Sequence, residues 1–270
     1  MGFGPSRAFG NLEVLMKTKN EQFEERLLMG RQVLECAGPP ALSVGPGLLR
    51  KRQRAAAVQD AAALARLPRA FLRRPEMLVF LALTLWFSAP ALTGSFSNSM
   101  IFQPEAVHHG EWWRLGAHPF VHVTWYHLLL DGAAFFLLYH SLLETGLVRR
   151  LAYVAAGGAG SLLFSWAAAP AIATSGLCGL SGIAHGLMAV SALEMVALHP
   201  RRTAEWRYGL FTLLMVVGKA AIEALSGRVL FGFLYFGLVG DPVAVSHAGG
   251  ILGCLTMMLF FRSLSHPRTV

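Results

Sequence analysis

Charged side chains are scarce in this sequence. Only 14% of its 270 residues are Asp, Glu, Lys or Arg, whereas 54% are hydrophobic, and the mean hydropathy is +0.50. A soluble globular domain carries about 25% charged residues, so this composition argues against a soluble protein. The abundance of apolar side chains also argues against intrinsic disorder.

Cysteine is also rare. Cys36, Cys178 and Cys254 lie far apart and form no Cys-x-x-Cys pair. Neither a disulfide framework nor a thiolate metal site is therefore indicated.

The positive charge is unevenly distributed. The net charge is +8, and residues 1–75 contain 13 Lys and Arg against 6 Asp and Glu. A basic segment that precedes apolar runs is typical of the cytoplasmic side of a membrane and favours contact with anionic lipid. Because no interleaved aromatic and basic pattern accompanies this charge, we do not expect nucleic acid as a partner.

Long apolar runs fill the rest of the chain. A membrane-spanning helix needs about 20 mostly apolar residues, and six stretches meet this requirement: 76–94, 125–147, 151–170, 179–199, 207–225 and 242–262. If the N-terminus lies in the cytoplasm, seven of the ten Lys and Arg after residue 75 fall on the cytoplasmic side, as the positive-inside rule expects. The sequence thus predicts an all-α polytopic membrane protein.

Three regions follow from this topology. We expect a basic cytoplasmic extension over residues 1–75, with an amphipathic helix near 11–35, a six-helix membrane domain over 76–262, and a short cytoplasmic tail over 263–270. Residues 95–124 are predicted to form an aromatic-rich external loop. The apolar stretch 229–240 is too short to span and is predicted to be an external cap.

Polar side chains within the predicted spans mark candidate functional sites, because they are costly in lipid. Ser181 and His247, on different helices, suggest a nucleophile and its general base, since a serine hydroxyl is a poor nucleophile without a proton acceptor. Backbone N–H groups at the beginning of the Ser181 helix are free to bind an oxyanion. Two Gly-x-x-x-Gly pairs would let these helices approach closely: Gly182 with Gly186, and Gly249 with Gly253.

Three motifs in this order resemble those of rhomboid intramembrane serine proteases. They are Trp113-Arg114-x-x-x-His118-x-x-x-His122-x-x-x-x-His127, Gly179-x-Ser181-Gly182 and His247-x-x-Gly250. Finer detail is similar to the bacterial rhombosortase branch of this family: Gly110–Arg114, Phe120–His127, Gly179–Leu187, and Lys219 with Glu223 and Gly227. The resemblance covers about residues 76–262 and implies a six-transmembrane-helix rhomboid-like bundle with an N-terminal cytoplasmic extension.

The resemblance also implies residue roles. Ser181 would attack the scissile carbonyl, and His247 would act as base and then as acid, in a dyad without an orienting aspartate. His127 would donate to the oxyanion together with the Ser181 backbone N–H. Gly179 and Gly182 would flank the nucleophile, and His122 would support the loop.

Two positions depart from the family pattern. Asp131 stands where rhomboids usually carry Asn, so it either donates to the oxyanion as a neutral acid, pairs with His127, or leaves the site. His185 stands where many rhomboids carry a Tyr that packs on the catalytic histidine. It would stack on or hydrogen-bond His247, or simply pack there.

A further pair of charged residues lies in the fifth predicted span. Lys219 and Glu223 are four residues apart and are expected to pair across one helical turn. The pair would either stabilise the bundle as a neutralised unit or take part in substrate gating.

The resemblance implies a serine endopeptidase in a bacterial inner membrane, with its active site open to the periplasmic side. Its partners would be the lipid bilayer and a single-span membrane protein with a Gly-Gly-type C-terminal sorting segment. Whether an accessory membrane protein is required is left open. No cofactor or metal is expected. The alternatives are a catalytically inactive relative that binds transmembrane helices, and a metal-binding protein that uses His118, His122, His127 and His185.

Overall fold

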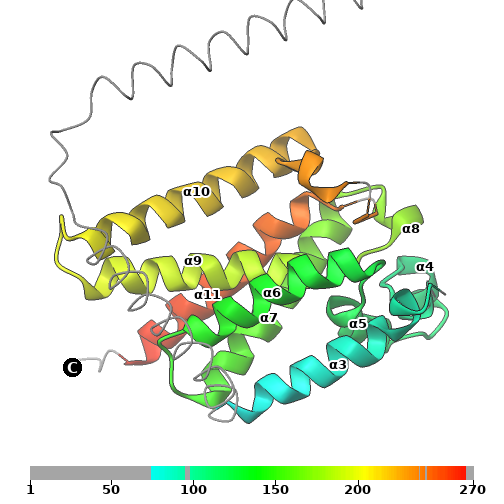
Figure 1. The fold of residues 1–270 in the computed structure, drawn as a ribbon, viewed down its shortest axis with the longest axis horizontal. Helices are drawn as coiled ribbons and strands as arrows, with labels where there is room; N and C mark the ends of the chain where they lie inside the picture. The colour runs from blue at the N-terminus through cyan, green and yellow to red at the C-terminus, as the bar shows by residue number, and fades with distance from the viewer. Residues whose placement is uncertain (1–73, 95–97, 237, 241, 266–270) are drawn as a thin grey trace, which may run out of the picture. The chain divides into compact units, whose positions relative to one another are not determined.

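The computed structural model describes residues 74–94, 98–236, 238–240 and 242–265. Within those ranges every regular element is helical, apart from one isolated bridge between Phe102 and Leu177. The described residues exclude three predicted segments: the helix near residues 11–35, the extension as far as residue 73 and the tail after residue 265. The predicted domain boundaries therefore stay a prediction. Six long helices form the frame (Figure 1): α3 (Pro75–Leu92), α6 (Trp125–Ser141), α7 (Leu147–Ala168), α9 (Ser181–Leu198), α10 (Ala204–Ser226) and α11 (Val245–Ser265).

The six predicted spans correspond to these six helices. Five of them are individually long and apolar enough to cross a membrane: α3, α7, α9, α10 and α11. The remaining candidate is a bent pair, in which Arg114–Phe120 and Trp125–Ser141 meet at 92°. The predicted all-α polytopic bundle is therefore confirmed.

Local sequence signals set the ends of two helices near the site. The Thr124 hydroxyl accepts a hydrogen bond from the His127 backbone N–H at 3.1 Å and so caps the start of α6. Gly227, with φ of +66°, ends α10 in a left-handed conformation that favours glycine. These signals place His127 in the first turn of α6 and Glu223 in the last turn of α10.

Helix α9 lies among the other helices and packs against α6, α7, α10 and α11 (Figure 1). It approaches α11 backbone to backbone, since a Cβ on Gly186 would lie 2.5 Å from the Gly250 carbonyl oxygen. The predicted contact of Gly249 and Gly253 with α9 is wrong. Gly249 and Gly253 face α7, where a Cβ on Gly249 would lie 2.6 Å from the Phe164 Cβ. Adjacent helix positions point about 100° apart, so α11 uses Gly250 for α9 and its neighbours for α7.

The described part of the loop between α3 and α6, residues 98–124, contains four short helices. They are η1 (Asn98–Met100), α4 (Pro104–His108), α5 (Arg114–Ala117) and η2 (His118–Phe120). The buried Arg114 holds this loop together, because it donates to the Ile101 carbonyl at 2.6 Å and pairs with Glu111 at 2.6 Å. Reciprocal backbone bonds between Phe102 and Leu177 tie the loop to the residues that precede α9.

In the predicted cap over residues 229–240, the described residues 229–236 and 238–240 contain one short helix, η3 (Gly232–Tyr235), and no helix long enough to span a membrane. Several of its apolar side chains line the cavity described below.

Candidate active site

A cavity of about 320 Å³ lies at one end of the bundle. It is bounded by α6, α9, α10, α11 and the cap that contains η3. The structure thereby brings most of the predicted site residues to one place, together with a lysine of α10: His127, Asp131, Ser181, His185, Lys219 and His247.

Ser181 is the first residue of α9, and the turn before it depends on Gly179. The φ of Gly179 is +99°, and its backbone N–H donates to the His118 carbonyl at 3.1 Å. A Cβ at this position would lie 2.7 Å from Asp131 Oδ2 and 2.8 Å from His127 Nε2. Both the backbone conformation and the lack of space therefore require glycine here.

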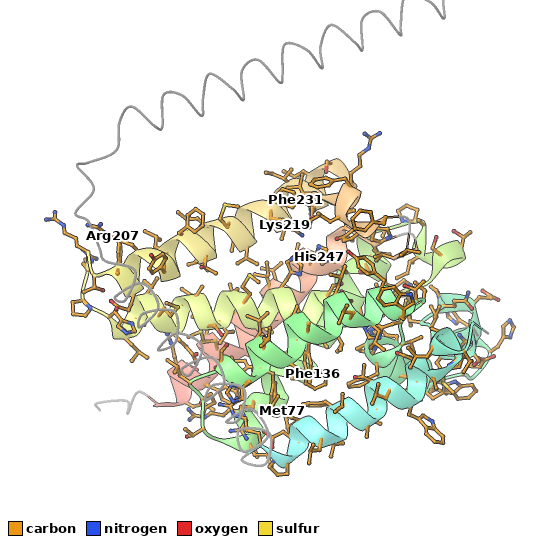
Figure 2. All side chains as sticks on the ribbon, viewed as in Figure 1. Met77, Phe136, Arg207, Lys219, Phe231 and His247 are labelled. Atoms are coloured by element: carbon orange, nitrogen blue, oxygen red, sulfur yellow. The ribbon has the colours of Figure 1, made fainter. Side chains whose placement is uncertain are left out.

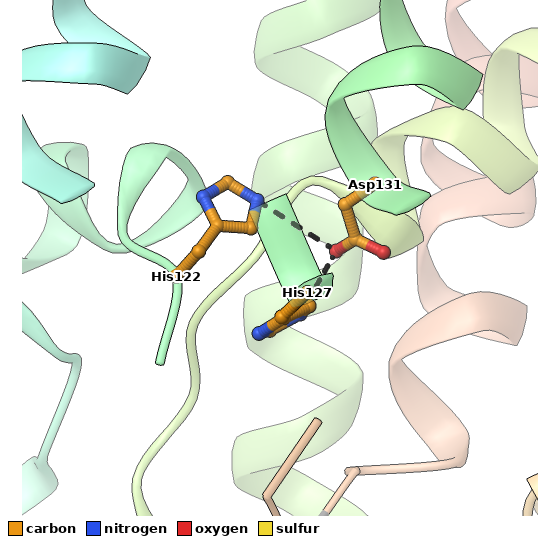
Figure 3. A group of neighbouring side chains, drawn as sticks. All are labelled: His122, His127 and Asp131. Atoms are coloured by element: carbon orange, nitrogen blue, oxygen red, sulfur yellow. Dashed lines mark hydrogen bonds and ion pairs between the residues drawn. The ribbon is translucent and has the colours of Figure 1, made fainter. Parts of the chain in front are cut away.

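Two hydrogen-bond donors converge on one oxygen beside Ser181. Asp131 Oδ2 accepts from the Ser181 backbone N–H at 3.0 Å and from His127 Nε2 at 3.1 Å (Figure 3). The Val123 N–H donates to His127 Nδ1 at 3.4 Å, so the ring hydrogen of a neutral His127 lies on Nε2. Of the alternatives for Asp131, the structure shows pairing with His127. The two donors have the arrangement of an oxyanion hole that holds an internal carboxylate.

His122 lies behind this pair. Its Nδ1 lies 3.0 Å from the Ser88 hydroxyl, which itself donates to the Phe120 carbonyl at 3.0 Å. The hydroxyl therefore accepts from His122, which places the ring hydrogen on Nδ1. Its Nε2 lies 3.9 Å from Asp131 Oδ2 and has no hydrogen-bond partner among the described residues (Figure 3). His122 thus joins the loop to α3 while one nitrogen faces the site.

His247 contacts the carboxylate of Glu223, which the sequence predicted only as the partner of Lys219. The Nδ1 of His247 lies 2.6 Å from Oε2 of the fully buried Glu223. The predicted pair on α10 is confirmed, because Lys219 Nζ lies 2.7 Å from Glu223 Oε1. Figure 2 shows Lys219 and His247 near Phe231 of the cap and far from Arg207 at the other end of α10. The spacing of Lys219 and Glu223 was a signal for their pairing, but no signal along α10 indicated that this pair faces α11.

His185 stacks on His247, with ring centroids 3.9 Å apart and an interplanar angle of 14°. This is one of the two contacts that the sequence suggested. His185 makes its hydrogen bonds to other groups, because its Nδ1 donates to the Ser181 carbonyl at 2.8 Å and its Nε2 accepts from Lys219 at 3.0 Å.

The Ser181 hydroxyl forms no hydrogen bond among the described residues, so none joins it to His247. The two side chains line the same cavity. In enzymes without bound substrate, catalytic hydrogen bonds are often long and shorten only when substrate binds.

Two clusters contain ligand atoms that lie within 4.8 Å of one another, as a metal site requires: His122 with His127 and Asp131, and His185 with Glu223 and His247. In the first cluster, the Nε2 of a neutral His127 carries a hydrogen directed at Asp131 and so is not free to bind a metal. In the second, the Lys219 ammonium group lies beside Glu223 and His185 and would repel a cation. His118 belongs to neither cluster; its Nδ1 faces the backbone carbonyls of Arg114 and Leu115.

The Rhomboid domain family matches residues 109–265, which is more than half of the chain and includes α6 to α11. The chain therefore belongs to the rhomboid family, whose members are generally intramembrane serine proteases that act on transmembrane substrates. It is a multi-pass membrane protein. A search of curated proteins finds no significant match.

Proposed function

We propose that this protein is an active intramembrane serine endopeptidase, with Ser181 as the nucleophile and His247 as the general base. The observation that carries the proposal is the convergence at Ser181. Its side chain shares a cavity with His247, and its backbone N–H and His127 Nε2 are directed at one anionic oxygen. Acyl transfer needs this set of groups: a nucleophile, a base and a pair of donors for the developing oxyanion.

The reaction would proceed in two stages. His247 Nε2 accepts the Ser181 hydroxyl proton as Oγ bonds to the scissile carbonyl carbon. The resulting oxyanion takes the position of Asp131 Oδ2 and accepts hydrogen bonds from Ser181 N–H and His127 Nε2. The C–N bond then breaks, and His247 passes its proton to the leaving amine. Water hydrolyses the acyl-enzyme through the same base and releases Ser181.

Cys178, three residues before Ser181, also lines the cavity and has a side chain that can act as a nucleophile. Burial raises the pKa of its thiol to about 12, and the nearby Asp131 carboxylate adds to this shift. Because the thiolate is the reactive form, Cys178 is a poor nucleophile near neutral pH. We therefore expect Cys178→Ala to retain activity.

The substrate we propose is a single-span membrane protein, cut near the external face to remove a Gly-Gly-type C-terminal segment. The similarity of Gly179–Leu187 and the other motifs to the rhombosortase branch supports this choice. Small residues at the cleavage site would favour cleavage, because glycine destabilises a helix and exposes its peptide bonds to the enzyme. The distribution of Lys and Arg supports a cytoplasmic N-terminus and a site that opens to the periplasmic side of an inner membrane.

Labelling of membranes with a fluorophosphonate probe tests the proposal. We expect the parent to label and to cut a Gly-Gly-tailed reporter, and both signals to be lost in Ser181→Ala and His247→Ala. Ser191→Ala is the matched control, because Ser191 lies on the same helix outside the cavity. A parent that neither labels nor cuts, but captures the reporter, would favour the inactive helix-binding alternative. Equal cutting of a reporter with Leu-Leu in place of Gly-Gly would overturn the substrate assignment alone.

A further inference from the structure

The contact between His247 and Glu223 is not needed for a two-residue mechanism. We propose that Glu223 is a positioning residue that completes a Ser181–His247–Glu223 triad, and that Lys219 holds its carboxylate in place. This inference rests on the proposed function and deepens it. It differs from a Ser–His dyad because the base would have a dedicated carboxylate, supplied by a third helix.

The hydrogen bonds determine which nitrogen of His247 can act as base. A carboxylate oxygen only accepts, so the 2.6 Å contact with Glu223 Oε2 places a hydrogen on Nδ1. In the neutral ring Nε2 then carries the lone pair that must accept the Ser181 proton. When that proton arrives, the Glu223 charge stabilises the imidazolium. These are the two tasks of the carboxylate in a serine-protease triad.

The Glu223 carboxylate is itself held on several sides. Lys219 Nζ contacts Oε1 at 2.7 Å and Oε2 at 2.9 Å, and the Leu230 backbone N–H donates to Oε1 at 2.8 Å. If Lys219 and Glu223 served only to neutralise each other's charge, the hydrogen bond between Glu223 Oε2 and His247 would not be required. Because these contacts fix the carboxylate before reaction, little reorganisation is required when His247 becomes charged.

The same lysine also orients the ring that stacks on the base. The Ser181 carbonyl accepts from His185 Nδ1, so His185 Nε2 carries a lone pair and accepts from Lys219 at 3.0 Å. One ammonium group thus fixes Glu223 beside one edge of His247 and His185 against its face. Ser181, His247 and Glu223 come from α9, α11 and α10, respectively, so the triad would exist only when all three helices are packed.

Glu223→Gln is the informative variant. We expect kcat to fall by about 10²- to 10⁴-fold with a nearly unchanged KM, as when a serine-protease triad loses its carboxylate. Glu223→Asp should recover part of this loss. The matched control is Glu194→Gln, which removes a carboxylate that caps the Leu143 N–H far from the cavity and should leave activity unchanged.

The pH profile separates positioning from a structural role. Among the described residues, seven titratable groups contact His247 or line the same cavity: Glu223, Lys219, His185, Asp131, His127, Tyr235 and Cys178. Only the Glu223 charge changes in Glu223→Gln. Its loss removes the counter-charge of the imidazolium, so the acidic limb of kcat/KM against pH should move to lower pH. A purely structural pair would lower the thermal midpoint but leave this limb in place.

Unchanged kcat and an unchanged acidic limb in Glu223→Gln would overturn the triad. If this variant does not accumulate, NMR of the parent with ¹⁵N-labelled histidine decides. A strongly deshielded ring N–H proton that disappears in His247→Ala supports the triad, and its absence overturns it. Failure of the proposed function is distinguishable, because Ser181→Ala would then label as the parent does.

Discussion

Replacement of Asp131 by Asn is expected to increase catalytic activity, because of where the Asp131 carboxylate lies. Its Oδ2 accepts from Ser181 N–H at 3.0 Å and His127 Nε2 at 3.1 Å, where the substrate oxyanion would have to bind. In the proposed mechanism, substrate would therefore displace a charged acceptor before the reaction proceeds. Asp131→Asn keeps the size of the side chain and an oxygen for the same donors, but it removes the charge.

The expected magnitude follows from the two hydrogen bonds. Each contributes about 1.5–3 kcal/mol when the acceptor is charged and about 1 kcal/mol when it is neutral. Loss of the charge should then lower the free energy of displacing residue 131 by about 2 kcal/mol. Since about 1.4 kcal/mol is a factor of ten, we expect kcat/KM in Asp131→Asn to rise by about 30-fold.

Steady-state cleavage of a transmembrane reporter at neutral pH measures this effect. Glu205→Gln is the control, because it removes the same charge from the exposed first turn of α10, at the end of that helix remote from Glu223. A tenfold or larger loss of kcat/KM in Asp131→Asn, with normal activity in the control, would refute the reasoning. It would mean that the carboxyl group itself takes part in the reaction.

Two further predictions concern stability and are measured by unfolding in detergent. Gly186→Ala should destabilise the protein by about 1–3 kcal/mol and reduce activity, because its Cβ would clash with α11. Gly218→Ala, which meets no atom within 4 Å, should be neutral or stabilising, and equal effects of the two would refute the packing argument. Glu76→Ala should cost about 3–5 kcal/mol, because it leaves the buried Arg150 without its carboxylate. Glu105→Ala, which breaks an exposed pair, should cost less than about 1 kcal/mol, and a similarly small loss in Glu76→Ala would contradict the expected role of burial.

The amino-acid sequence determined those features that depend on local pattern. The apolar runs predicted all six helices, because crossing a membrane imposes a minimum length and composition on each span. The four-residue spacing of Lys219 and Glu223 predicted their ion pair, because residues at this spacing are neighbours on one helix face. Ser181 and His247 could be identified as candidates because polar side chains in a membrane span are energetically costly and therefore often functional.

Only the tertiary structure decided which faces meet. The rotation of α10 about its axis brings Glu223 to His247, and that of α11 turns Gly250 rather than Gly249 toward α9. The position of Asp131 between Ser181 and His127 likewise depends on how α6 meets α9. These rotations result from side-chain packing between segments far apart in the chain. The spacing of residues along a single helix contains no information about them.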